Sequence, residues 1–186
     1  EHVVDKATKL ETIYNRIHEV RMRFELIKKE AETQFWKQCC QGGSRELLLQ
    51  QLEHTYKTLD EEFAFVANCN LGGESMQQDD LDRLQTIARR TWTRTLDDRL
   101  GLSIEELKRG QADAPVPLPC SEPLLADKAI HRFSRPEQSM QAALKSSRFN
   151  LVIPELLENN GELHNLSIRR GTLNEEERSR INLHIV

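Results

Sequence analysis

The sequence has no long hydrophobic run, and this absence argues against a membrane-spanning helix. No apolar stretch among its 186 residues approaches the roughly 18 residues that such a helix requires. The first residues do not have the pattern of a signal peptide. The length of 186 residues predicts one domain, or one domain plus an appendage, and we expect it in the cytoplasm.

The chain also lacks a positive charge excess and the usual cysteine spacing of a small zinc site. Its formal net charge is -4, whereas a general nucleic-acid binder usually carries a basic surface. The four cysteines include no Cys-x-x-Cys pair, which argues against a zinc knuckle. We therefore expect no nucleic-acid partner, and we interpret the cysteines as reduced thiols.

Two common catalytic signatures are missing as well. There is no glycine-rich phosphate loop and no Gly-x-Ser-x-Gly elbow. The acidic pairs Asp79-Asp80 and Asp97-Asp98 are neighbours in sequence, so their side chains point to different helix faces. We interpret them as capping and surface residues, and we predict no catalytic residue in this chain.

The strongest pattern in the sequence is a heptad repeat. Apolar residues recur at alternating steps of three and four, which is typical of a coiled-coil seam; they are Leu10, Ile13, Ile17, Val20, Phe24, Ile27 and Ala31. Gly42 and Gly43 then predict a helix end, and Ser44 is a suitable N-cap for the next helix. A second stripe follows, formed by Leu49, Leu52, Tyr56, Leu59, Phe63 and Val66.

The flanking charges indicate that the two stripes pair with each other. The first helix has mostly basic edges and the second has acidic ones, so folding back brings opposite charges together. The expected neighbours are Arg21 with Asp60, Lys28 with Glu53, and Arg23 with Glu62. We therefore predict an antiparallel coiled-coil hairpin; a homodimer through the remaining apolar surface stays open.

The whole pattern predicts an all-α fold. Residues 1–110 would form a helical bundle with helices at about 2–40, 44–69, 76–97 and 104–109, and residues 111–150 a proline-containing linker or strap. In the third helix, Trp92 would share the buried face with Leu81, Leu84 and Ala88. Two interpretations remain for Arg89, Arg90 and Arg94: a phosphate or nucleotide site, or a solvated helix face, which we favour.

The last residues predict one more helix. Thr172 and Glu175 have capping-box spacing, so we expect the helix to begin at Leu173 and to carry His184 on the face of Ile181. Glu175, Glu176 and Glu177 suit the positive end of its dipole. Because helical patterns run up to both chain ends, we interpret Glu1 and Val186 as interior points of a longer polypeptide.

The stretch "GTLNEEERSRINLHIV" resembles the Gly-x-Leu-(Ser/Thr)-x-Glu-Glu-x-x-x-Ile-x-x-His segment of HD-GYP-type phosphohydrolases, with Asn174 in the Ser/Thr place. The resemblance implies an all-helical enzyme that hydrolyses cyclic di-GMP with iron or manganese, and that follows sensor modules through long helices. It makes His184 a metal ligand that acts together with sequence beyond Val186. The family's His-Asp dyad should lie near residues 155–156, where this chain has Glu155-Leu156, and His164 has a different spacing. Residues 151–186 would therefore begin a degenerate HD-like domain.

These observations predict a signal-relay and regulatory segment of an HD-GYP-like metal-dependent phosphodiesterase. Its partners would be an upstream sensor module and a downstream HD domain of the same chain. A single histidine cannot hold a metal pair, so we expect no cofactor and no activity in this chain alone, with iron or manganese in the longer protein. The alternative is a non-enzymatic helical module for protein–protein interaction.

Overall fold

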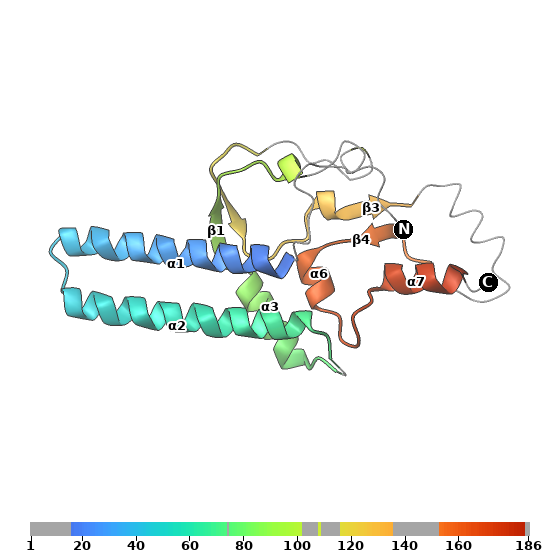
Figure 1. Ribbon diagram of the computed structural model, residues 1–186, viewed down its shortest axis with the longest axis horizontal. Helices are drawn as coiled ribbons and strands as arrows, with labels where there is room; N and C mark the ends of the chain where they lie inside the picture. The colour runs from blue at the N-terminus through green and yellow to red at the C-terminus, as the bar shows by residue number, and fades with distance from the viewer. Residues whose placement is uncertain (1–15, 74, 102–107, 109–115, 136–152, 185–186) are drawn as a thin grey trace.

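The computed structural model describes residues 16–73, 75–101, 108, 116–135 and 153–184. They form a mostly helical fold with two small antiparallel sheets, so the all-α prediction is correct only in part (Figure 1). The elements are α1 (Arg16–Cys40), α2 (Arg45–Asn70), α3 (Gln78–Ala88), β1 (Thr91–Arg94), η1 (Asp98–Gly101), β2 (Cys120–Pro123), η2 (Ala129–His131), β3 (Arg132–Ser134), β4 (Leu156–Asn159), α6 (Glu162–Leu166) and α7 (Glu175–His184).

The predicted hairpin is confirmed. Helices α1 and α2 lie side by side and antiparallel, and their connection is at one end of the molecule, far from α6 and α7 (Figure 1). Gly42 has a φ of +90°, in the left-handed region that a residue without a side chain adopts at low cost. Ser44 precedes α2 in an extended conformation, as expected of an N-cap, although its side chain makes no capping hydrogen bond.

The two predicted apolar stripes pack against each other in the hairpin. Phe24 and Leu59 are fully buried, and the ring of Phe24 meets Phe63 edge-on with 5.6 Å between centroids. Arg21 Nη1 donates to Asp60 Oδ1 at 3.0 Å, as predicted. Apolar burial between the stripes therefore holds the pair, and the partly exposed Arg21–Asp60 ion pair adds little.

Two of the three expected ion pairs are wrong. Lys28 Nζ donates to Asp60 Oδ1 at 2.6 Å rather than to Glu53. Arg23 is bound by Glu162, and Glu62 is bound by Arg90. The partners of Arg23 and Glu62 come from elements outside the hairpin, so a two-helix argument could not include them. Lys28, in contrast, binds a different carboxylate of α2 itself.

The third helix is shorter than the sequence indicates. It ends at Ala88 rather than near residue 97, and Thr91–Arg94 forms the strand β1. This strand pairs antiparallel with β2, with Thr91 opposite Pro123 and Arg94 opposite Cys120. Threonine and tryptophan suit a strand, and the partner strand supplies the backbone hydrogen bonds that a continuing helix would have made.

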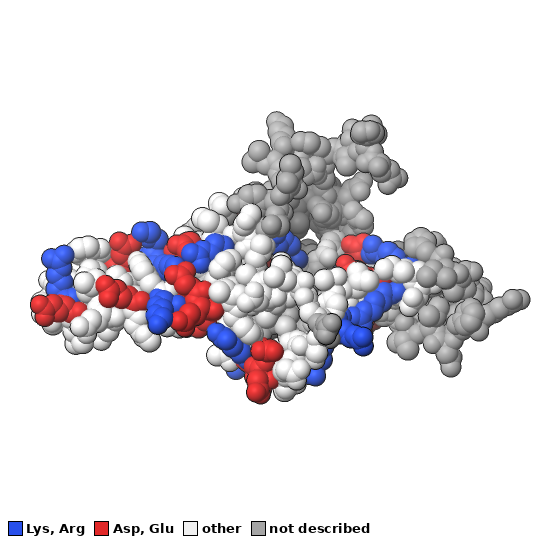
Figure 2. Space-filling model, turned by 60° about the horizontal axis from the view of Figure 1, so that its bottom comes forward, with Lys and Arg blue, Asp and Glu red and all other residues white. Residues whose placement is uncertain are grey.

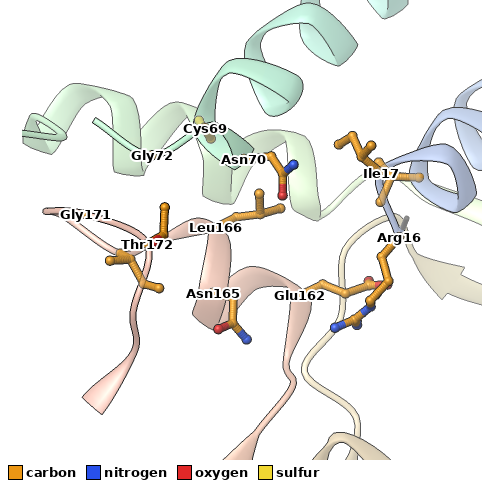
Figure 3. A pocket seen from close by; sticks show the side chains of 12 residues that line it. Arg16, Ile17, Cys69, Asn70, Gly72, Glu162, Asn165, Leu166, Gly171 and Thr172 are labelled. Carbon is orange, nitrogen blue, oxygen red and sulfur yellow. The ribbon is translucent and has the colours of Figure 1, made fainter. Parts of the chain in front are cut away.

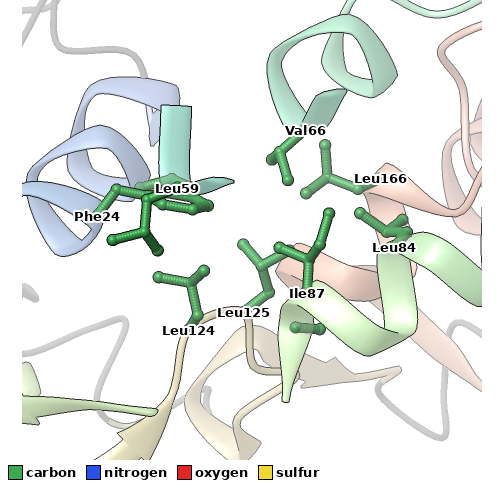
Figure 4. Packing of buried hydrophobic residues seen from close by; sticks show 10 residues of the cluster. Phe24, Leu59, Val66, Leu84, Ile87, Leu124, Leu125 and Leu166 are labelled. Carbon is green, nitrogen blue, oxygen red and sulfur yellow. The ribbon is translucent and has the colours of Figure 1, made fainter. Parts of the chain in front are cut away.

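Part of the expected linker is folded into the core. The described residues 116–135 contain β2 and β3, and they place Leu124 and Leu125 at 0% and 2% exposure. Figure 4 shows both leucines directed toward residues of α1, α2 and α3. The core cluster consists of Val20, Phe24, Leu59, Val66, Leu84, Ile87, Ala88, Leu124, Leu125 and Leu166. The expected helix at 104–109 lies outside the described residues.

Strand β3 pairs with β4, and α6 contacts both α2 and α3. Helix α7 lies against β4 beyond the base of the hairpin (Figure 1). In the described part of the chain, no helix has the length and apolar character needed to cross a membrane.

Candidate functional site

A buried polar contact lies where the hairpin meets the segment that leads into α7. There the beginning of α1 and the end of α2 both contact α6, and the residues after α2 contact the connection that follows α6. We call this region the base joint. Its members are Arg16 and Arg23 of α1, Gly72 and Gly73 after α2, Glu162 of α6, and Gly171 before α7.

The α1 side of the base joint is a buried ion pair. Glu162 accepts hydrogen bonds from Arg23 Nη1 and Nη2 at 2.8 and 2.9 Å, and from the backbone N–H of Ala126 at 3.1 Å. The side chains of Arg23 and Glu162 are 17% and 6% exposed. Burial by itself raises the pKa of Glu162, but the Arg23 guanidinium outweighs it and holds this pKa below the ordinary 4.5. The pair is therefore charged at neutral pH.

Arg23 also connects α1 to the core segment that follows β2. Its Nη1 donates to the carbonyl oxygen of Leu124 at 2.9 Å, and its guanidinium lies 5.4 Å from the centre of the Trp92 ring. Arg16, the first residue of α1, donates to the carbonyl oxygen of Asn160 at 2.7 Å. Two arginines of α1 thus contact the chain immediately around the start of α6.

The α2 side of the base joint is a close approach between two glycine connections. The N–H of Gly171 donates to the carbonyl oxygen of Gly73 at 3.0 Å. Gly72 and Gly171 have φ values of +69° and +73°. A Cβ on Gly72 would lie 2.7 Å from the Thr172 methyl group. Only glycine at this position lets the two connections pack at their present distance.

The start of α7 differs from the prediction by two residues. The helix begins at Glu175, and its cap is Asn174 rather than Thr172. Asn174 Oδ1 accepts from the N–H of Glu177 at 2.9 Å, and Glu177 Oε2 accepts from the N–H of Asn174 at 3.0 Å. This is a reciprocal capping box, displaced from the Thr172–Glu175 pair that the sequence suggested.

Asn174 also joins α7 to the elements beside it. It is buried, and its Nδ2 donates to the carbonyl oxygen of Asn159 at 3.1 Å and to Asn165 Oδ1 at 2.9 Å. A second contact between α6 and α7 brings His164 Nε2 to 3.6 Å from Glu176 Oε2. The cap therefore ties the first turn of α7 to α6, and His164 lies beside Glu176 without a hydrogen bond between them.

The predicted metal ligand, His184, is the last residue of α7. Within the described residues, no three His, Cys, Asp or Glu side chains are grouped so that they could hold a metal ion. The position expected for the family's dyad, Glu155-Leu156, lies at the beginning of the strand β4. His184 as a metal ligand stays a prediction that depends on residues beyond Val186.

Two of the three arginines considered for phosphate binding, Arg90 and Arg94, are bound by carboxylates, and the third, Arg89, is the exposed C-cap of α3. Arg90 binds Glu62 through Nε and Nη2 at 2.5 and 2.7 Å. Arg94 donates to Glu122 at 2.7 Å, and Lys128 donates to the same carboxylate at 2.8 Å. Burial by itself raises the pKa of Glu122, but Lys128 and Arg94 outweigh it and lower this pKa. These cations are committed to carboxylates, and Figure 2 likewise shows acidic and basic side chains intermixed along the hairpin.

Sequence reasoning missed the base joint. Arg23 and Glu162 are 139 residues apart, and no motif connects them. The one local signal is Gly171 ahead of the last helix, because a glycine there permits a positive φ. The chain matches no family model, and no curated protein or solved structure was found to be similar to it. Its function is therefore inferred from its own residues and contacts.

Proposed function

We propose that this chain is a signal-relay and regulatory segment of an HD-GYP-like metal-dependent phosphohydrolase of the cyclic di-GMP phosphodiesterase type. The observation that carries the proposal is the base joint, because it connects both helices of the hairpin to the segment that leads into α7. The resemblance of residues 171–184 to the family motif makes α7 the helix that contributes a metal ligand, His184.

The contacts supply a path for a mechanical signal. An upstream sensor that shifts or rotates α1 would displace Arg23, and the two-pronged hydrogen bond would carry Glu162 and α6 with it. The Asn165–Asn174 hydrogen bond then connects α6 to the cap of α7. A shift of about an ångström at a catalytic metal ligand is enough to change a hydrolytic rate by orders of magnitude.

The proposal requires partners within the same polypeptide. The upstream partner is a sensor module, and the downstream partner is an HD domain that supplies further ligands for iron or manganese. One histidine cannot hold a two-metal site, so this chain alone would be inactive. A homodimer through the exposed apolar residues of the hairpin would be compatible with the relay.

The test uses the complete reading frame that encodes this chain, loaded with iron or manganese. We expect hydrolysis of cyclic di-GMP, and we expect Arg23→Lys to change its rate severalfold at unchanged metal content. Lysine keeps the positive charge but loses the two-pronged geometry. The matched control is Arg45→Lys, at the start of α2 near the hairpin turn, which should leave the rate unchanged. Absence of hydrolysis with either metal would contradict the enzymatic half of the proposal.

One observation favours the second candidate, a non-enzymatic interaction module. Near the hairpin turn, Trp36, Leu47 and Leu49 are 51%, 56% and 43% exposed. Apolar side chains gathered at the free end of a hairpin are typical of a surface that contacts another protein. This candidate predicts that the complete protein binds a partner through the hairpin and hydrolyses no cyclic dinucleotide, so the same assay separates the two.

A further inference from the structure

A cavity of about 160 Å³ lies inside the base joint. It is bounded by the first turn of α1, the end of α2, α6, and the connection between α6 and α7 (Figure 3). An apolar cavity of about 150 Å³ is large enough to hold a benzene ring. The cavity therefore fits a ligand with a body of about six carbon atoms.

The walls of the cavity are mainly apolar. Ile17 and Val20 form the α1 side, and Leu166 and Ile168 form the opposite side. Val20 and Leu166 are buried core residues, so this wall continues the hydrophobic core. The thiol of Cys69 also lines the space, and burial raises its pKa, so it is neutral at pH 7. Such walls bind an apolar body better than a polar one.

One end of the cavity is lined by a guanidinium group, that of Arg16, and a carboxylate, that of Glu162. Arg16 and Glu162 point toward one another there (Figure 3). However, the carboxylate is already bound in a two-pronged manner by Arg23 at 2.8 and 2.9 Å. Arg16 Nη2 stays 3.6 Å from Glu162 Oε1, and the Arg16 side chain is 47% exposed. Two guanidinium groups thus face one carboxylate, and Arg16 keeps N–H donors that can bind another acceptor.

From the apolar walls and the spare guanidinium donors, we infer that this cavity is a binding site for a small amphipathic carboxylate. Its carbon body lies between Ile17, Leu166 and Ile168. Its carboxylate accepts hydrogen bonds from Arg16, the pairing for which a planar guanidinium is suited. A neutral ligand of the same size would leave those donors unpaired and would bind more weakly.

A ligand in this cavity would contact three parts of the fold at once. The cavity touches both helices of the hairpin and the connection into α7, so an occupant would fix these three parts relative to one another. The inference goes beyond the proposed function, because binding can be measured on this chain whether or not the complete protein hydrolyses a cyclic dinucleotide.

The test is a titration of the 186-residue chain with benzoate, followed by methyl NMR and calorimetry. We expect saturable binding, with shifts of the Ile17, Val20, Leu166 and Ile168 methyl signals and none at Leu47 or Leu49. Benzyl alcohol, which has the ring without the charge, should bind about tenfold more weakly, since a hydrogen bond to a charged group contributes about 1.5 kcal/mol or more.

Two variants separate a specific site from weak association with the surface. Arg16→Gln should weaken benzoate binding by about tenfold, whereas Arg45→Gln at the far end of the hairpin should not change it. Equal affinity for benzoate and benzyl alcohol, methyl shifts spread over the whole surface, or no saturation at millimolar benzoate would each overturn the inference. The wild-type shifts locate the ligand even if the Arg16 variant fails to fold.

Discussion

At the scale of single residues, the most consequential group is the carboxylate of Glu162. It is a charged group in the interior, bound by Arg23 and by a backbone N–H. A buried charge is tolerated only while its partners remain, so removing one partner costs far more than losing a surface ion pair. The same burial connects the stability of the fold to pH.

Glu162→Gln should lower the free energy of unfolding by about 3 kcal/mol at pH 7, because Arg23 would be left buried without a countercharge. In the wild type, the folded-state pKa of Glu162 lies below the ordinary 4.5. Its stabilising contribution is therefore present above about pH 4.5 and is lost as the pH falls through the folded-state value.

Urea denaturation at a series of pH values between about 3 and 7 checks this, and the variant should show a weaker loss of stability on the acid side. Glu61→Gln, at an exposed position of α2, is the control and should stay within about 0.5 kcal/mol of the wild type. Parallel pH curves for wild type and Glu162→Gln would contradict the role given to this carboxylate.

At the scale of elements, the sequence predicted which segments are helical better than it predicted the residues at which these helices begin and end. The glycine stop after α1 was placed correctly, because Gly42 needs no partner from elsewhere to adopt its positive φ. The end of α3 and the start of α7 were predicted at the wrong residues. In both cases a neighbouring element decided: β2 pairs with β1, and Asn159 and Asn165 hold Asn174.

Asn174→Ala should destabilise the protein by about 2 kcal/mol, at the upper end for a helix cap, because Asn174 also binds β4 and α6. Thr172→Ala, at the exposed position that the sequence suggested as the cap, should cost less than about 0.5 kcal/mol. Urea unfolding midpoints of the two variants measure the difference directly. A larger cost for Thr172→Ala would return the cap to the residue expected from the sequence.

At the scale of the whole molecule, the hairpin is covered at its base by chain from the second half of the protein. Leu124 and Leu125 enter the same core as Phe24 and Leu59 (Figure 4). The described part of the proline-containing segment therefore helps to hold the hairpin, and we expect it to unfold together with α1 and α2.

Leu124→Ala should destabilise the fold by about 2–5 kcal/mol, the range for removing a fully buried leucine side chain. Val116→Ala in the same segment, where the side chain is 54% exposed, should cost less than about 0.5 kcal/mol. Thermal unfolding followed by helical circular dichroism tests this, since a surface strap would leave the helical transition unchanged in both variants.

The sequence by itself determined the hairpin: the position of its turn, the packing of its two apolar stripes, and the Arg21–Asp60 contact. These follow from the heptad periodicity and from the glycine turn, which together set which residues of the two helices face one another. Only the tertiary structure decided the strands, the displaced cap of α7, the inward position of Leu124 and the Arg23–Glu162 pair. The physical reason is that a charged or backbone group binds whichever partner the complete fold brings nearest, and that partner can lie more than a hundred residues away.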